Sequence, residues 1–405
     1  MKKILIAVVA ALASLFFTSK AQTPEDNPFS GVQAQMEAMR EAVSRNDNAA
    51  ALRHAEAMMV ELTQLPDSLV RYNDDLWGDC YYDLACYQSL NGRTDAALLS
   101  LYNAYIKGWD NYAHLLEDHD LDPIRNDSRF AAIADKLHEL DYNYVLKQSA
   151  PYAADSAAAS LPKFTYVTGG DARLAELRCV LNLDSVCAGG DELSKIKRLT
   201  TFVHNYIRHN GSRPINCDRN GLAMVEACGG GKGELNCRGM AILLNECLLS
   251  MGIPSRYVTC YPKVMIDDCH VINSVWSSQL GRWIWMDPSF NAWVTDENGE
   301  LLGQREVRQR IIEGKPLVLN DEANHYDGKT YKGWYLDRYM TKNLYCIEAI
   351  SYNGYGSEDK NCIDERVAAG DDYIILTPCG FHPEGYGRHK STCDDNVFWA
   401  APDAK

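Results

Sequence analysis

The sequence has no concentration of basic side chains and, past its first twenty residues, no apolar run long enough to cross a bilayer. Its 405 residues hold 40 Lys and Arg against 55 Asp and Glu, a formal net charge of −15. We therefore expect neither nucleic acid nor an anionic membrane surface as a partner. With 46% apolar and 23% charged residues the composition is that of a globular protein. The length predicts two or more domains.

The N-terminus has the pattern of a signal peptide. Lys2 and Lys3 precede an apolar run over residues 4–17, and Ser19-Lys20-Ala21 forms a small-x-small cleavage site. A retained membrane anchor is the alternative, but the run is short for a bilayer span. We expect residues 1–21 to be removed and the mature protein to work outside the cytoplasm, in the periplasm or beyond.

Fourteen cysteines in an exported chain favour disulfides, although the sequence does not give their connectivity. Near the C-terminus, Cys379, His382, His389 and Cys393 have outer spacings typical of metal ligands, but the gap between the two histidines is short for a zinc finger. A Cys379–Cys393 disulfide or a plain loop is the simpler interpretation. The sequence thus predicts no metal and no cofactor.

Residues 30–148 have helical periodicity and are expected to form helical hairpins. One hairpin resembles a tetratricopeptide repeat, because small residues such as Ala85 and Ala97 stand where two antiparallel helices would approach closely. This domain is interpreted either as a scaffold that binds a protein partner or as a packing lid on the rest of the chain. Residues 161–320 mix helix and strand patterns, and 321–405 are expected to form a C-terminal β-rich extension, either an appendage or a continuation of the central sheet.

The strongest chemical signal is Cys237. Asn236 is a good N-cap, and an apolar stripe at helical spacing runs from Met240 to Met251, before the stop signal Gly252. Cys237 is therefore predicted in the first turn of a helix. There the positive helix end and unpaired N–H groups favour a thiolate and can hold a developing oxyanion.

A predicted β-hairpin supplies the partners of this thiol. Strands at 270–276 and 282–287 are joined by a short link, and pairing of Trp276 with Gly281 would place His270 opposite Asp287. Asp287 could then orient His270, and His270 could take the proton of Cys237. The thiolate would attack a carbonyl to form an acyl-enzyme, which water or an amine resolves.

These residues resemble the transglutaminase-like superfamily, relatives of papain-type cysteine enzymes. The resemblance rests on the segments around Cys237, His270 and Asp287 and on 251–258, and it covers roughly 193–291. It implies an α+β fold in which the cysteine helix packs on an antiparallel sheet, with those three residues as the catalytic triad. The family often places a Trp or Gln upstream in the oxyanion hole; here Asn205 is the candidate.

The resemblance implies an enzyme that acts on amide bonds of peptides or proteins. Hydrolysis is favoured over crosslinking, because crosslinking requires an amine to compete with water in a shaped acceptor site. The alternative is a catalytically inactive transglutaminase-like scaffold whose helical domain recruits a protein partner.

Overall fold

The computed structural model describes residues 28–66, 74–264, 268–326, 328–359, 373–383 and 390–403. The predicted signal peptide, 1–21, lies outside these residues. The chain divides into two compact units, Met1–Tyr144 and Val145–Lys405, each described by itself below. Within the described ranges, no helix combines the length and the apolar character that a membrane span requires.

The first unit is helical, which confirms the prediction for this region. Ala85 and Ala97, the small residues of the repeat-like hairpin, are both fully buried, as are Leu101 and Ala104 on the second helix of that hairpin. Small side chains at these positions allow the two helix backbones to approach closely. The helices are α2 (Ser30–Ser44), α3 (Asn48–Gln64), α5 (Asp74–Leu90), α6 (Thr94–Ile106), α7 (Tyr112–Glu117), η2 (His119–Ile124) and α8 (Ser128–Leu140), with α9 (Tyr142–Lys147) at the division between the units.

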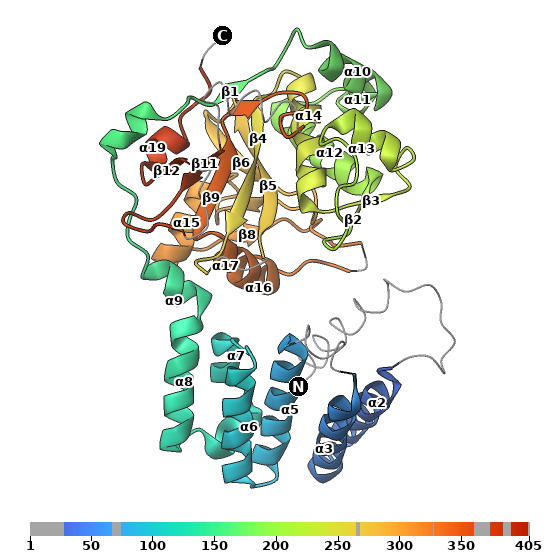
Figure 1. The fold of residues 1–405 in the computed structure, drawn as a ribbon, viewed down its shortest axis with the longest axis vertical. Helices are drawn as coiled ribbons and strands as arrows, with labels where there is room; N and C mark the ends of the chain where they lie inside the picture. The colour runs from blue at the N-terminus through green and yellow to red at the C-terminus, as the bar shows by residue number, and fades with distance from the viewer. Residues whose placement is uncertain are drawn as a thin grey trace. The chain divides into compact units, whose positions relative to one another are not determined.

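The second unit is built on a six-stranded sheet in the order β12-β11-β9-β4-β5-β6 (Figure 1). All neighbours are antiparallel except β11 and β12, so the sheet is mixed and the fold is α+β, as predicted. Its strands are β4 (Ser255–Tyr261), β5 (His270–Ser277), β6 (Arg282–Met286), β9 (Cys346–Ile350), β11 (Tyr373–Leu376) and β12 (Lys390–Thr392).

Short strand pairs and helices complete this unit. The pairs are β1 (Thr165–Tyr166) with β10 (Tyr352–Asn353), β2 (Arg208–His209) with β3 (Glu234–Leu235), and β7 (Val294–Thr295) with β8 (Val318–Leu319). The helices are η3 (Ser156–Ser160), α10 (Ala172–Val180), α11 (Leu183–Val186), α12 (Glu192–Tyr206), α13 (Gly221–Ala227), α14 (Cys237–Ser250), α15 (Gln304–Glu313), α16 (Lys332–Trp334), the π-helical turn η4 (Tyr335–Met340), α17 (Thr341–Asn343) and α19 (Asp395–Phe398).

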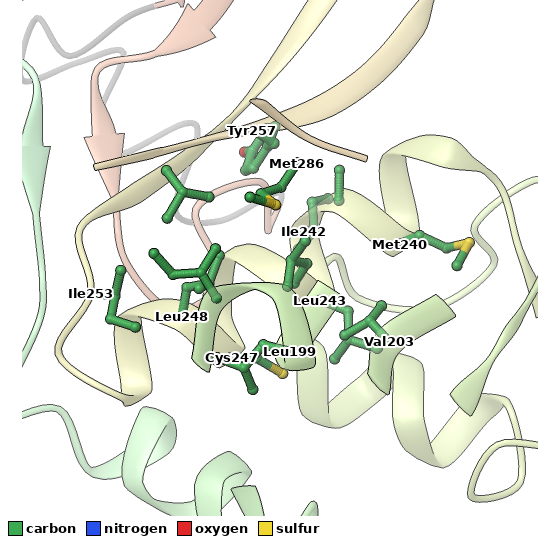
Figure 2. Close-up of a cluster of buried hydrophobic side chains, with 14 of the residues drawn as sticks. Leu199, Val203, Met240, Ile242, Leu243, Cys247, Leu248, Ile253, Tyr257 and Met286 are labelled. Carbon is green, nitrogen blue, oxygen red and sulfur yellow. The ribbon is translucent and has the colours of Figure 1, made fainter. Parts of the chain in front are cut away.

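Two hydrophobic cores lie on the two faces of the sheet. On one face, α14 packs against α12 and the sheet, and α14 is buried along almost its whole length (Figure 2). Leu243 and Cys247 of α14 meet Leu199 and Val203 of α12 in this core. The second core gathers α15, η4 and α19 with the opposite side chains of the sheet. Because α14 is buried from Gly239 to Leu249, its packing fixes the position of its first turn.

The β5–β6 hairpin forms, but its predicted register is wrong by two residues. Trp276 pairs with Trp283 rather than with Gly281, and the last pair is Ser277 with Arg282. Gly281 has φ +64°, a left-handed conformation that belongs to the turn and not to a strand. Since strand side chains alternate with a period of two, this shift leaves each side chain on its predicted face.

The segment 321–405, expected as a C-terminal extension, supplies β9, β11 and β12 to the same sheet as β5. Arg256 of β4 ties the end of the chain to this sheet. Its guanidinium is fully buried among four aromatic rings at 4.2–4.9 Å, and one of its N–H groups donates to the Phe398 carbonyl at 2.8 Å.

Candidate active site

Cys237 is the first residue of α14, as the sequence predicted. The side chain of Asn236 caps the helix by accepting a hydrogen bond from the Gly239 N–H at 3.0 Å. The N–H groups of Cys237 and Arg238 have no acceptor within the helix, because no preceding turn exists. The thiol therefore lies beside free donors and the positive end of a buried helix.

Arg238 fixes the first turn of α14 to the sheet. Its guanidinium donates to Glu358 Oε1 at 2.6 Å and to Thr259 Oγ1 on β4 at 3.0 Å. Arg219 also donates to the Glu358 carboxylate, at 2.9 Å, and that carboxylate is fully buried. Burial raises the pKa of Glu358, but the two guanidinium groups outweigh it and leave the pKa below its usual range.

Asp287 and His270 meet despite the altered register. The Nε2–H of His270 donates to Asp287 Oδ2 at 2.7 Å, and both side chains are buried. Tyr335, on the π-helical turn, donates its hydroxyl to the same oxygen at 2.6 Å, and the Ser289 N–H donates to Oδ1 at 2.8 Å. The Tyr335 oxygen in turn accepts from Trp285 Nε1 at 3.2 Å. A carboxylate held by three donors is fixed in place, and it fixes the imidazole.

This arrangement leaves Nδ1 of His270 for Cys237. Burial lowers the pKa of His270, but the Asp287 carboxylate and the Cys237 sulfur raise it to about 10. Burial raises the pKa of Cys237, but interactions with His209, His270 and the Val271 N–H lower it to about 5. For Asp287, burial acts upward and is outweighed by His270, so its pKa lies below the usual value. The three groups thus form a thiolate–imidazolium pair with an ionised aspartate behind it.

Aromatic rings surround the pair. Phe290 contacts His270 with ring centroids 5.6 Å apart, and it also packs on Tyr335 and Trp334. Tyr339 lies 5.3 Å from His270 and stacks on Trp334 at 5.3 Å. Trp334 is half exposed, so an aromatic surface reaches solvent beside the imidazole. Excluding water on this side strengthens the electrostatic interactions inside the site.

Asn205, the candidate for the oxyanion hole, lies at the surface, and the buried residue before it, His204, is bonded to other groups. Asn205 is exposed, on a part of α12 that lines a surface cavity of about 480 Å³ with Phe202 and Tyr206. His204 is buried, but Nδ1 is hydrogen-bonded to the Pro288 carbonyl at 2.9 Å and Nε2 to Asn324 Oδ1 at 3.0 Å. Neither side chain offers a free donor to Cys237.

Sequence reasoning missed His209, which the structure places near the thiol. It lies on β2, directly after α12, and pairs with Leu235 of β3, two residues before Cys237. The only signal for His209 in the sequence is its position, because it is a polar aromatic residue just past the end of a buried helix. Sequence reasoning also missed Tyr335, which reaches Asp287 from the π-helical turn η4.

A second sequence motif is the group of C-terminal cysteines and histidines considered as metal ligands. Within the described ranges, no three His, Cys, Asp or Glu side chains are grouped to hold a metal ion. His389 lies outside the described residues. The Cys379–Cys393 disulfide considered from the sequence is not formed: both residues are free thiols that interact with each other, which raises the pKa of Cys379 to about 11. The predicted absence of a metal and of a cofactor stays a prediction.

Comparison with known proteins identifies the segment that carries this geometry. Residues 184–288 match the transglutaminase-like superfamily. This segment is transglutaminase-like. The match ends just beyond Asp287 and includes Cys237 and His270, so a cysteine-type hydrolase or acyltransferase function is supported at the level of the family.

A solved structure from Cytophaga hutchinsonii, described as a "Putative Cysteine Protease", shares 16% identity with this chain at a TM-score of 0.23. The likeness covers 35% of this chain and 50% of that one, so this chain spans about half the length of that structure. The search of curated proteins found no match.

Proposed function

We propose that the protein is an exported cysteine-dependent amide hydrolase or acyltransferase that acts on peptide or protein substrates. One observation carries the proposal. The thiol at the start of a buried helix faces an imidazole whose other nitrogen lies 2.7 Å from a buried carboxylate. In this proposal Cys237 is the nucleophile, His270 the acid–base group and Asp287 the residue that orients it.

The steps follow from these positions. The Cys237 thiolate attacks the carbonyl carbon of an amide, and the carbonyl π electrons move to oxygen. The His270 imidazolium then gives its proton to the leaving nitrogen as the C–N bond breaks, and a thioester remains on Cys237. His270, now neutral, takes a proton from water as that water attacks the thioester. Release of the acid restores the ion pair.

Hydrolysis is the favoured outcome of the second half-reaction. An amine acceptor would need a shaped site that excludes water long enough for the amine to attack. Tyr339, with Trp334 stacked on it, covers one side of the imidazole, and a cover on one side does not make a closed acceptor site. We therefore propose water as the ordinary acceptor, and export as the setting in which the enzyme meets its peptide substrates.

The test is to trap the acyl-enzyme. Purified protein would be incubated with a peptide library, quenched in acid and digested, and adducts on the Cys237 peptide would be found by mass spectrometry. The proposal expects adducts that hydroxylamine removes, as it does thioesters. Cys237→Ala is the control, and the same adducts on that variant would refute the assignment.

A competing proposal is an inactive transglutaminase-like scaffold whose helical unit recruits a protein partner. The observation that favours it is a row of exposed apolar side chains on α6, Leu99, Tyr102 and Ile106, which are 62%, 41% and 57% exposed. The two proposals separate on thiol chemistry. Under the scaffold proposal, reduced Cys237 would react with iodoacetamide no faster than the other accessible thiols at about pH 5.5, where an ordinary thiol is almost wholly protonated.

A further inference from the structure

A second histidine, His209, interacts with the Cys237 thiol in addition to His270, and both interactions lower the pKa of Cys237. His209 pairs with Leu235, and the next residue, Asn210, donates its N–H to the Leu235 carbonyl at 2.8 Å. These contacts hold β2 against the chain that leads into α14. The ring of His209 also packs on Phe290, at 6.2 Å, the same ring that contacts His270.

One nitrogen of His209 is already engaged. Its Nδ1 lies 3.0 Å from Nε2 of His325. Its Nε2 is buried and makes no full hydrogen bond to any of the described residues, which leaves it to the Cys237 sulfur with which the ring interacts. A buried polar nitrogen without a partner costs free energy, which is recovered where a ligand atom supplies the partner.

Chemistry decides which nitrogen of His209 carries the proton. If His209 donated from Nδ1 to His325, its Nε2 lone pair would face the thiolate, and two electron-rich atoms would repel each other. If His325 donates instead, Nδ1 of His209 is the acceptor and Nε2–H points toward the negative charge. The anionic sulfur therefore selects the tautomer with Nε2–H.

We propose that His209 is a catalytic residue that supplies the side-chain donor of the oxyanion hole, with His325 as the positioning residue that fixes its tautomer. This inference rests on the proposed function. In the resting enzyme the Nε2–H faces the thiolate. When sulfur attacks the carbonyl carbon, negative charge moves from sulfur to the carbonyl oxygen. That oxygen then accepts hydrogen bonds from His209 and from the N–H groups at the start of α14.

The backbone supports this position for His209. Its N–H donates to the hydroxyl oxygen of Tyr326 at 3.0 Å, and that hydroxyl donates to the carbonyl of His204 or Ile207, at 2.9 and 3.1 Å. Tyr326 adopts φ +42° and stacks on His204 with ring centroids 4.4 Å apart. Residues 325–326 therefore hold His209 at two points. Tyr326 accepts a hydrogen bond from its backbone N–H, and His325 contacts Nδ1 of its ring.

The experiment compares two reactions of the same sulfur. Acylation by p-nitrophenyl acetate passes through a tetrahedral oxyanion, whereas alkylation by iodoacetamide does not. Both rates would be measured against pH and compared where the thiolate is complete. In His209→Phe, which keeps a ring but has no donor, acylation should fall by about 10²- to 10³-fold, the usual effect of removing one oxyanion donor. Alkylation should change by less than about threefold, because no oxyanion develops.

Matched variants separate the possible causes. His209→Gln keeps an N–H donor and should recover part of the acylation rate. His325→Phe should give a loss smaller than that of His209→Phe. Arg208→Ala changes the neighbouring side chain on β2, which lies over the Tyr326 ring, and should acylate like wild type. Circular dichroism and urea unfolding would establish that each variant is folded.

The outcomes distinguish the two proposals. Equal losses of acylation and alkylation in His209→Phe would mean that His209 acts only on the thiolate, and the oxyanion role would be overturned. Acylation of that variant at the wild-type rate would overturn it too. If wild-type Cys237 is alkylated but never acylated, the proposed acyl-transfer function itself fails, and the role of His209 fails with it.

Discussion

The ion pair at Cys237 predicts an unusual dependence of thiol reactivity on pH. The pKa of Cys237 is lowered to about 5 and that of His270 is raised to about 10. The thiolate is lost as pH falls through the lower value, and the imidazolium is lost as pH rises through the upper one. Between these limits the pair persists, so the rate of thiol modification should form a plateau.

The rate advantage of Cys237 over an ordinary thiol depends on two opposing quantities, the fraction of the thiol that is ionised and the nucleophilicity of each thiolate. At about pH 5.5, roughly 75% of Cys237 is thiolate, whereas an ordinary thiol with a pKa of about 8.5 has roughly 0.1%. Nucleophilicity falls with pKa along a Brønsted slope of about 0.45, so a pKa lower by about 3.5 makes each thiolate roughly 40-fold less reactive toward disulfides. The net advantage of Cys237 at about pH 5.5 is therefore roughly 20-fold.

Near neutral pH the order reverses. At about pH 7.5 an ordinary thiol is roughly 10% ionised, so full ionisation gives Cys237 only a tenfold gain against the roughly 40-fold loss of nucleophilicity. Cys237 should then react about fourfold more slowly than an exposed ordinary thiol. A single rate at neutral pH would thus miss the ion pair, and acidic pH reveals it.

The assay follows pyridine-2-thione release from 2,2′-dipyridyl disulfide across the pH range. Cys237→Ser supplies the background of the other thiols, and subtraction gives the Cys237 rate. The expected profile rises with a midpoint near the pKa of about 5 and is then flat. In His270→Ala the midpoint should move to higher pH, because the cation that stabilises the thiolate is gone. A wild-type midpoint near that of an ordinary thiol would refute the reasoning.

Three further substitutions test the supports of the site by urea unfolding. Tyr335→Phe removes a donor to the buried Asp287 carboxylate and should cost about 1.5–3 kcal/mol of unfolding free energy, with a lower rate of acylation. Arg256→Lys cannot stack a planar cation among four rings and should cost at least about 1 kcal/mol, whereas a neutral result would contradict the packing argument. Asn236→Ala removes the cap on Gly239 and should cost about 1 kcal/mol; an unchanged urea midpoint would show that the cap contributes nothing.

The cysteine helix could be predicted because every signal for it is local. Asn236 supplies the cap, the apolar stripe supplies the buried face, and Gly252 supplies the stop. All three act within one segment of the chain, and the observed helix, Cys237–Ser250, ends one residue before the predicted stripe does. Local agreement of this kind is what makes a long amphipathic helix the most predictable element of a fold.

The hairpin was predicted less well, and the reason is a single residue. Treating Gly281 as a strand residue sets the register two residues away from the observed one, because its left-handed backbone belongs to the turn. The meeting of His270 and Asp287 survived the error because two residues is one full period of a strand. An error of one residue would have sent His270 to the opposite face.

The remaining parts of the site could not be read from the sequence, since they depend on contacts between distant segments. The pairing of β2 and β3, which brings His209 to the thiol, is two residues long and has no detectable alternation. Tyr335 reaches Asp287 from a π-helical turn, and Glu358 reaches Arg238 from 120 residues further along the chain.

These distant contacts show how the site depends on the end of the chain. The matched segment, 184–288, contains Cys237, His270 and Asp287. Yet one of the three donors to Asp287, the Tyr335 hydroxyl, and the carboxylate that fixes Arg238 both come from residues beyond 320, and so does β9, the neighbour of β4 in the sheet. Without β9, β4 would be an unpaired edge beneath the cysteine helix. The geometry of the proposed catalytic site therefore depends on residues outside the matched segment, and the residues after 320 hold in place the groups that the transglutaminase-like segment supplies.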